Sequence, residues 1–389
     1  MDIFKLEQQL GLVNPQRSAR WEHLTQDESG KRYGDVKDNF SKYTVEKMLD
    51  NTIAGACEAY GMMGVGPDTV MKLVKESTTN SSPGIATFLK FAFPLVRRIW
   101  AKSIGRNLVS VQPMSLPTAM VFTLDHLRNT GGTQLQDRSV AGAKDYALDP
   151  GELSTPVREL NLRVTSTSVT ATAKKIKTVN SIEVGQDLMS YHGINISNEL
   201  LGIMATEIAL EIDQQIIYDL VTGAGAGNIN WNSNGGNSAP TELEAHRKTI
   251  KNAFTSASNL IFRNLYRDAN FIVGGVAEVE LLEQLGDHNF NPAPDQGVSQ
   301  YGRVLVGKLF GKYNVYKDPF FPVDDQFLVG YKGQNWLESG YIFAPYIPYM
   351  TVPQFINPDD FSVTKAAMSR QAFYMKNSGA YATVSIVSS

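Results

Sequence analysis

The clearest hydrophobic pattern in the chain spans residues 197–221 and has the period of an α-helix. Apolar residues recur there at every fourth position: Leu200, Met204, Ile208, Ile212, Ile216 and Leu220. A second apolar series lies beside the first: Leu201, Ala205, Ala209, Ile217 and Val221. Ser197 or Asn195 can cap the N-terminal end, and the glycine-rich segment 223–227 follows the C-terminal end. The predicted helix is roughly 35 Å long, enough to brace a whole domain.

The opposite side of this predicted helix is acidic. It carries carboxylates and, between residues 197 and 221, no Lys or Arg: Glu199, Glu207, Glu211, Asp213 and Asp219. We expect this face to be solvated or to meet basic groups of a neighbouring molecule.

The one compact basic run is Lys174, Lys175 and Lys177. Such a run could contact nucleic-acid phosphates, but no aromatic residue interleaves it, so base stacking is not supported. We favour contacts with carboxylates of a neighbouring subunit, such as those on the acidic helix face.

Alternation of residue types predicts a long β-hairpin upstream of the helix. Leu162, Val164 and Ser166 face one way while Arg163 and Thr165 face the other, and a similar period of two continues to residue 173. The preceding segment is polar and glycine-rich. We favour an extended hairpin with a polar tip. The alternative is an ordinary hairpin joined by a long unstructured crossover, but about 30 structureless residues inside a compact domain would be unusual.

Helix and strand patterns interleave in the second half of the chain. Helices are predicted over 242–265 and 276–285. Strands are predicted over 270–273, 304–309, 313–316, 326–331 and 341–344, and strand patterns return over 355–387. This interleaving predicts an α+β or mixed α/β domain.

The N-terminal residues show mixed charge and short helical patterns without a long apolar run. Residues 44–60 have helical spacing, and Ser82 with Pro83 can begin a further helix. The mixed charge suits an arm that lies across neighbouring subunits, and a poorly ordered terminus is the alternative for the first 40 residues.

Composition excludes several classes of protein. Of 389 residues, 42% are hydrophobic and 19% charged, which is ordinary for a folded chain. The formal net charge of -3 argues against a protein that coats DNA directly. It does not exclude a container for DNA, because an inner wall near neutrality avoids trapping the polymer. Cys57 is the single cysteine, so no intramolecular disulfide or cysteine-based zinc site can form.

No apolar run approaches the roughly 20 residues that span a bilayer, so we expect no membrane association.

Catalytic signatures are also missing. The glycines at 223–227 follow a helix, whereas a phosphate-binding loop precedes one. The five histidines lie in separate segments without helical zinc spacing. Ser362 and Lys365 match the S-x-x-K pattern, but its companion motifs are missing. We therefore predict a protein that is not an enzyme and has no cofactor and no metal site.

Two segments carry a family resemblance. Residues 108–125 read LVSVQPMSLPTAMVFTLD, in which Pro113 and Pro117 direct the chain out of a helix and into a strand. Residues 327–333 (FLVGYKG) and 339–346 (SGYIFAPY) form a second match. With order and spacing kept from about residue 82 to the C-terminus, the chain resembles the major capsid proteins of tailed bacteriophages of the T-even type.

The resemblance implies an α+β fold of the HK97 type, with an axial domain inserted into a peripheral domain. The expected parts are an N-terminal arm (1–82), the start of the peripheral domain (83–125), an extended loop (126–177), the peripheral domain with its spine helix at 197–221 (178–240), the axial domain (241–350) and a C-terminal return to the peripheral domain (351–389).

The resemblance also implies a structural function. The chain is expected to self-assemble into hexamers, with pentamers as a further option, that form an icosahedral head around double-stranded DNA without sequence-specific binding. Expected partners are further copies and other head proteins of the vertex, portal, scaffold and decoration types. The expected location is the virion after assembly in the host cytoplasm. Candidate self-assembly residues are Lys174, Lys175, Lys177, Glu199, Glu207, Glu211, Arg138 and Asp145.

Two alternatives stay open on the sequence alone. One is an encapsulin-like shell of the same fold that holds a protein cargo. The other is an enzyme whose site is assembled from residues far apart in the chain.

Overall fold

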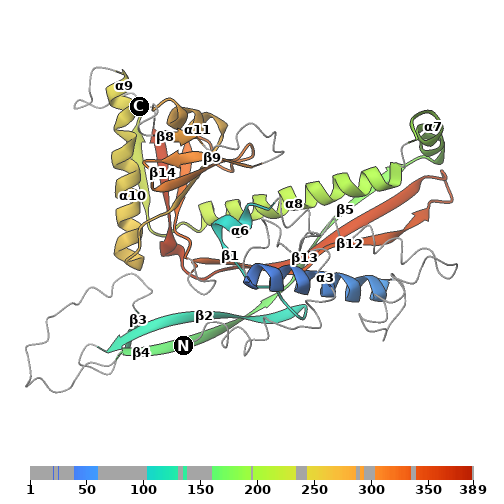
Figure 1. Cartoon of the computed structure of the whole chain (residues 1–389), viewed down its shortest axis with the longest axis horizontal. Coiled ribbons are helices and arrows are strands. Elements are labelled where there is room, and N and C mark those ends of the chain that lie inside the picture. Colours follow the sequence, from blue (N-terminus) through green and yellow to red (C-terminus); the bar gives the residue numbers. More distant parts are fainter. Residues whose placement is uncertain are drawn as a thin grey trace, which may run out of the picture.

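In the part of the chain that it describes, the computed structural model shows an α+β protein with three separate β-sheets (Figure 1). It describes residues 21, 25, 39–59, 103–129, 135–137, 160–193, 196–233, 243–285, 290–292, 303–333 and 339–387. One long helix crosses the molecule between a seven-stranded sheet at one end and a four-stranded sheet along its length (Figure 1).

The long helix is α8 (Ile196–Thr222), which coincides with the helix predicted over 197–221. Its apolar series is buried, including Ile208, Ile212 and Ile216. These side chains belong to the largest core cluster, in which they meet residues of the four-stranded sheet. The Tyr349 hydroxyl donates a hydrogen bond of 3.0 Å to the backbone oxygen of Leu201 near the start of α8. The period of four read from the sequence thus produces the face that α8 packs against the sheet.

The four-stranded sheet has the order β1-β12-β13-β5. Its strands are β1 (Ser110–Val111), β12 (Tyr341–Ile356), β13 (Val363–Met375) and β5 (Thr172–Asn180). Helix α3 (Asn39–Ala59) packs along β12, where the Asn51 side chain donates hydrogen bonds of 2.8 Å to the backbone oxygens of Met114 and Tyr346. Most of the predicted arm (1–82) lies outside the described residues. In the part that is described, Val45, Met48, Leu49 and Ile53 are buried in the chain's own core.

The seven-stranded sheet has the order β6-β14-β11-β7-β10-β9-β8. Its strands are β6 (Asn228–Asn232), β14 (Tyr381–Val387), β11 (Gln326–Gly330), β7 (Phe271–Gly274), β10 (Tyr313–Lys317), β9 (Val304–Leu309) and β8 (Phe290–Pro292). Helices α9 (Leu243–Lys248), α10 (Ile250–Leu265) and α11 (Val276–Glu283) accompany it (Figure 1). A second core forms here, in which Phe254 of α10 meets Phe327 of β11 edge-to-face at 5.2 Å between ring centroids.

A long hairpin forms the third sheet, of order β3-β2-β4. Strand β2 (Thr118–Asn129) pairs antiparallel with β4 (Leu160–Thr170), and β3 (Leu135–Asp137) pairs with the far end of β2. The hairpin begins earlier than the predicted loop at 126–177, because the pairing starts at Thr118 opposite Thr170. It also ends earlier, because β5 leaves the hairpin to pair with β13. Residues 130–134 and 138–159 lie outside the described part.

The boundary expected between the axial domain (241–350) and the C-terminal segment (351–389) does not coincide with the boundary between two sheets. That boundary cuts β12, which pairs with β13 from Tyr341 to Ile356 as one strand of the four-stranded sheet. The last strand, β14, belongs to the segment that was expected to return to the peripheral domain. It pairs with β11 and β6 in the seven-stranded sheet. Alternation predicts a strand without naming its hydrogen-bond partner, so the sequence could not choose between the sheets.

Three short elements connect these layers. Helix α6 (Gly105–Leu108) precedes β1, and the 3-10 helix η1 (Ser378–Ala380) precedes β14. Helix α7 (Ile182–His192) follows β5; the Ser181 hydroxyl accepts a hydrogen bond from the Val184 N–H at its start, and Gly193 with φ 65° ends it.

Replacing Leu49 by Ala tests whether α3 belongs to the subunit core. Leu49 is fully buried, so the variant should lose about 2–5 kcal/mol of the free energy of unfolding, measured by urea denaturation of the unassembled subunit. Ala54→Ser, at an exposed position of the same helix, should change it by less than about 0.5 kcal/mol. Equal effects of the two changes would show that α3 is not part of the core.

Candidate assembly surfaces

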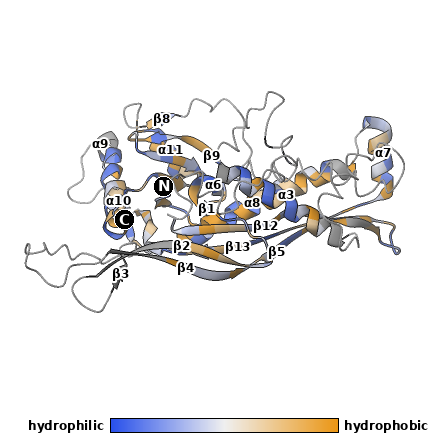
Figure 2. Cartoon of the chain, turned by 60° about the horizontal axis from the view of Figure 1, so that its bottom comes forward, coloured by the Kyte–Doolittle hydropathy of each residue, from blue (hydrophilic) through white to orange (hydrophobic). Residues whose placement is uncertain are grey.

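The hairpin of β2 and β4 has one buried and one exposed face. Val121 and Val169 are buried against the four-stranded sheet, in a cluster with Ile342 and Ala372. Figure 2 shows β2 and β4 as a layer of their own beside β12 and β13. The Gln112 side chain fixes the base of the hairpin, since it donates to the backbone oxygen of Phe122 at 3.2 Å and accepts from its N–H at 3.4 Å.

The exposed face of the hairpin carries large apolar side chains. Met120 lies opposite Ser168 and Phe122 opposite Ser166, and Val164 follows at the same spacing of two along β4, so these positions share one face. The exposed fractions are 63% for Met120, 46% for Phe122 and 60% for Val164. We define these three side chains as the hairpin patch. A cluster of exposed apolar groups on a strand pair is typical of a surface that another molecule covers.

The acidic side of α8 is smaller than the sequence predicted. Glu199, Glu207 and Glu211 are exposed, as expected. Asp219 instead accepts hydrogen bonds within the chain, from the Tyr341 hydroxyl at 2.5 Å and from the Gln215 side chain at 2.7 Å. Three carboxylates are therefore left on the solvent side.

Asp213 was expected on the solvated face and is buried instead. Its carboxylate accepts hydrogen bonds from the Ser103 hydroxyl at 2.7 Å, the Ile104 N–H at 3.0 Å and the Gly105 N–H at 3.3 Å. Burial raises the pKa of Asp213 above its usual value, and these donors with the charge of Arg303 act in the opposite direction. A sequence signal existed, because position 213 falls inside the apolar series Leu201, Ala205, Ala209, Ile217 and Val221.

The lysine run divides between the two faces of β5. The Lys174 ammonium lies 2.9 Å from the Glu211 carboxylate of α8 in the same chain, so this pair does not need the neighbouring subunit that the sequence suggested. Ile176 shares the face of Lys174 and packs against the core, whereas Lys175 and Lys177 are exposed on the opposite face, because successive residues of a strand alternate. β5 is also the edge of its sheet, where lysine side chains hinder pairing with further strands. Arg138 and Asp145 lie outside the described residues.

A buried ion pair joins α8 to the seven-stranded sheet. The Arg303 Nε lies 3.1 Å from an Asp318 carboxylate oxygen, and both side chains are nearly inaccessible to solvent. The same guanidinium donates to the backbone oxygen of Leu210 at 3.2 Å and to the Gln214 side chain at 2.5 Å. Gln214 in turn donates to the backbone oxygen of Phe320 at 2.6 Å. Sequence reasoning missed this junction because its members are far apart in the chain and form no motif.

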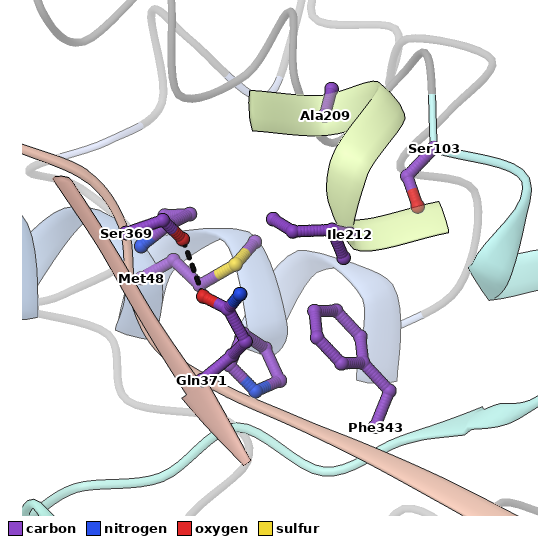
Figure 3. A pocket seen from close by; sticks show the side chains of 9 residues that line it. Met48, Ser103, Ala209, Ile212, Phe343, Ser369 and Gln371 are labelled. Atoms are coloured by element: carbon purple, nitrogen blue, oxygen red, sulfur yellow. Dashed lines mark hydrogen bonds between the residues drawn. The ribbon is translucent and has the colours of Figure 1, made fainter. Parts of the chain in front are cut away.

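The described part of the chain contains a small cavity. A cavity of about 20 Å³ lies between α3, α8 and the four-stranded sheet, lined mainly by apolar side chains such as Met48, Ile212 and Phe343 (Figure 3). That volume suits about one water molecule, whereas substrate pockets hold roughly 300–1,000 Å³. Ser369 donates a hydrogen bond of 2.5 Å to Gln371 at its wall (Figure 3).

Metal clusters and membrane-spanning helices are both absent from the part of the chain that the structure describes. No group of three or more His, Cys, Asp or Glu side chains in this part is placed to hold a metal ion. None of its helices combines the length and the apolar character needed to cross a membrane.

Replacing Arg303 by Leu should destabilise the subunit strongly, because Asp318 would remain as an unpaired buried charge. We expect a loss of about 3–5 kcal/mol in the free energy of unfolding, measured by chemical denaturation. Lys312→Leu breaks the exposed Lys312–Asp268 pair of 3.0 Å and should cost less than about 1 kcal/mol. Similar losses in both variants would contradict a special role for the buried pair.

Comparison with known proteins identifies the family. The family model described as "Major capsid protein Gp23" matches residues 85–150 and 129–387. The chain is 29% identical over 216 residues to the major capsid protein of Enterobacteria phage T6, a match that covers 51% of this chain and 43% of that protein. For Enterobacteria phage T4 the identity is also 29% over 216 residues, covering 51% of this chain and 41% of the relative. These matches span less than half the length of the relatives.

Solved structures give a more distant likeness. A chain of the Microbacterium phage Oxtober96 structure is 14% identical with a TM-score of 0.46, and the match covers 74% of this chain and 91% of that chain. The resemblance to T-even-type capsid proteins read from the sequence is confirmed by the family model, which covers well over half of the chain. The chain belongs to the Gp23 family of major capsid proteins.

Proposed function

We propose that this chain is a shell subunit that self-assembles into hexamers and closes into an icosahedral head around phage double-stranded DNA. The observation that carries the proposal is the family match over residues 85–150 and 129–387. The exposed hairpin patch supports it, because the chain presents apolar groups on a long projection where a neighbouring copy can cover them.

The proposed parts follow the HK97 plan in a revised division. The four-stranded sheet with α3 and α8 corresponds to the peripheral domain, and the seven-stranded sheet with α9, α10 and α11 to the axial domain. The β2 and β4 hairpin corresponds to the extended loop. In this division the C-terminal strand β14 belongs to the axial domain.

The hairpin would act by overlapping the next copy. Covering a large apolar side chain contributes about 1.5–3 kcal/mol when burial is complete, so one hairpin patch gives a contact of modest strength. Closure of a ring makes later contacts intramolecular, and many modest contacts then hold a stable assembly. The rigid base at Gln112 favours this use, because little conformational freedom is lost on docking.

Contacts with other proteins of the phage head are part of the same proposal. Vertex, portal, scaffold and decoration proteins would meet the assembled shell, which would form in the host cytoplasm and become part of the virion. DNA would be enclosed without sequence-specific contacts, in keeping with the net charge of -3. Glu199, Glu207, Lys175 and Lys177 are exposed and stay candidates for contacts between subunits.

The first experiment is sizing and electron microscopy of the purified full chain. Closed shells or hexameric rings are expected, and a chain that stays monomeric at every concentration tested would contradict the proposal. The ratio of absorbance at 260 and 280 nm in native particles then separates a DNA-filled head from a shell with protein cargo, which was the alternative of the same fold.

Replacing Phe122 by Asp tests the hairpin patch. The charge should not disturb folding, because the side chain is half exposed, but it should prevent docking and lower the yield of shells at least tenfold. Phe262→Asp is a matched control, since Phe262 on α10 has the same exposed fraction of 46% as Phe122. Shell yield is counted in micrographs, and equal losses in the two variants would speak against a specific role for the hairpin.

Replacing residues 131–155 by a short Gly/Ser turn tests the overlap itself. β2 and β4 can still pair through the register from Thr118 to Arg128, so the subunit should remain folded by circular dichroism and thermal melting. Closed shells should be lost, because each copy no longer reaches the next. A well-folded variant that still forms normal shells would refute the overlapping role, whereas aggregated, unfolded protein would place the segment in the subunit core.

A further inference from the structure

The turn between β12 and β13 presents an aromatic ring beside two carboxylates. Asp359, Asp360 and Phe361 are consecutive and exposed, and the Phe361 side chain is 68% exposed. Phe361 also has φ 52°, a left-handed conformation that a bulky residue rarely adopts. Residues held in such a conformation often serve a function, since their surroundings must hold them there. We call these three residues the acidic knob.

Hydrogen bonds within the turn hold the knob in place. The Asp360 carboxylate accepts from the Ser362 N–H at 3.0 Å and from the Ser362 hydroxyl at 2.7 Å. The Asn357 N–H donates to the Ser362 backbone oxygen at 2.9 Å, which closes the turn. These bonds lower the pKa of Asp360 below its usual value, which favours the charged carboxylate.

The same end of the four-stranded sheet has an exposed face with the opposite charge. Residues paired across β5, β13 and β12 point to the same side of the sheet, and two such rows show which side chains lie on this exposed face. They are Lys177, Ala366 and Val352 in one row and Val179, Thr364 and Phe355 in the next. Val179, Val352 and Phe355 are exposed, and Lys175 and Lys177 lie on this face at the β5 edge. We call these five exposed residues the basic face.

Other parts of the described chain leave the basic face uncovered. α8 packs against the opposite side of the sheet, where Ile176 and Ala367 join the core. The hairpin covers only the region around Ile342 and Ala372, at the other end of the strands. Lys174 already pairs with Glu211, while Lys175 and Lys177 form no ion pair among the described residues.

We propose that the acidic knob of one copy docks on the basic face of a second copy, with Phe361 against the apolar side chains and Asp359 and Asp360 near Lys175 and Lys177. The two features are complementary in charge, and both combine apolar groups with charged ones. Asp360 precedes Ala366, the partner of Lys177 on β5, by six residues, which is roughly 20 Å along the strand. A contact between two copies through this end of the sheet brings both features into reach. The inference rests on the proposed shell function and adds a self-contact separate from the hairpin patch.

Charge reversal tests the contact in the full chain. Lys175→Glu with Lys177→Glu, and separately Asp359→Lys with Asp360→Lys, should each lower the yield of closed shells at least tenfold. The combined quadruple variant restores opposite charges and should return to within about twofold of the parent. Thermal melting of each unassembled variant should stay within about 2 °C of the parent, because all four side chains are exposed.

Disulfide trapping gives a test that does not depend on the yield of the variants. In a Cys57→Ser background, chains carrying Lys177→Cys are co-assembled with chains carrying Asp359→Cys and then oxidised. A mixed dimer should form in assembled particles. The pair Lys251→Cys with Asp359→Cys is the control, since Lys251 lies on α10 beside the seven-stranded sheet.

The outcomes separate the two proposals. If the parent chain forms no assemblies at all, the shell function fails. If the parent assembles while both double variants assemble normally, or the quadruple variant is not restored and no mixed dimer forms, then only the knob contact is refuted. Restoration together with the mixed dimer establishes a second copy as the occupant of the basic face.

Discussion

The guanidinium of Arg303 lies where α8 meets the seven-stranded sheet, paired with Asp318 and close enough to Asp213 to influence its pKa. All three side chains are buried. Charges removed from water are tolerated only when they are paired and hydrogen-bonded, so the elements that carry them must keep their relative positions. This requirement fixes α8, the start of β9 and the end of β10 together. α8 therefore holds the four-stranded sheet and the seven-stranded sheet in fixed positions relative to each other.

The packing of α8 between the two sheets also decides which apolar side chains stay exposed. The inner side of the four-stranded sheet and the apolar stripe of α8 bury each other. The apolar groups that stay exposed include the hairpin patch and the side chains near the turn between β12 and β13. Two peripheral surfaces at different places on one subunit allow two kinds of contact between copies. A closed shell needs contacts of more than one kind, because a single isologous contact ends at a dimer.

The candidate site was predicted only in part from the sequence. Exposed Glu199 and Glu207 were found from helical periodicity, since a solvent face can be read from the spacing of its apolar neighbours. The partner of Lys174 was not, because Glu211 is 37 positions away and their 2.9 Å distance depends on how α8 crosses β5. The hairpin patch was missed for a related reason. Both faces of β2 contain apolar residues, and only the docking of Val121 on the sheet decides which face is left exposed.

The sequence by itself determined the elements whose cause is local. The four-residue period specified α8, and the strands at 304–309 and 326–331 were located within one residue of β9 and β11 because alternation depends only on neighbouring positions. The tertiary structure alone decided the partners: β12 with β13, β14 with β11 and β6, and Asp213 with the amides of residues 104 and 105. Pairing joins residues far apart in the chain, and its free energy depends on which surfaces meet. No local pattern records that choice.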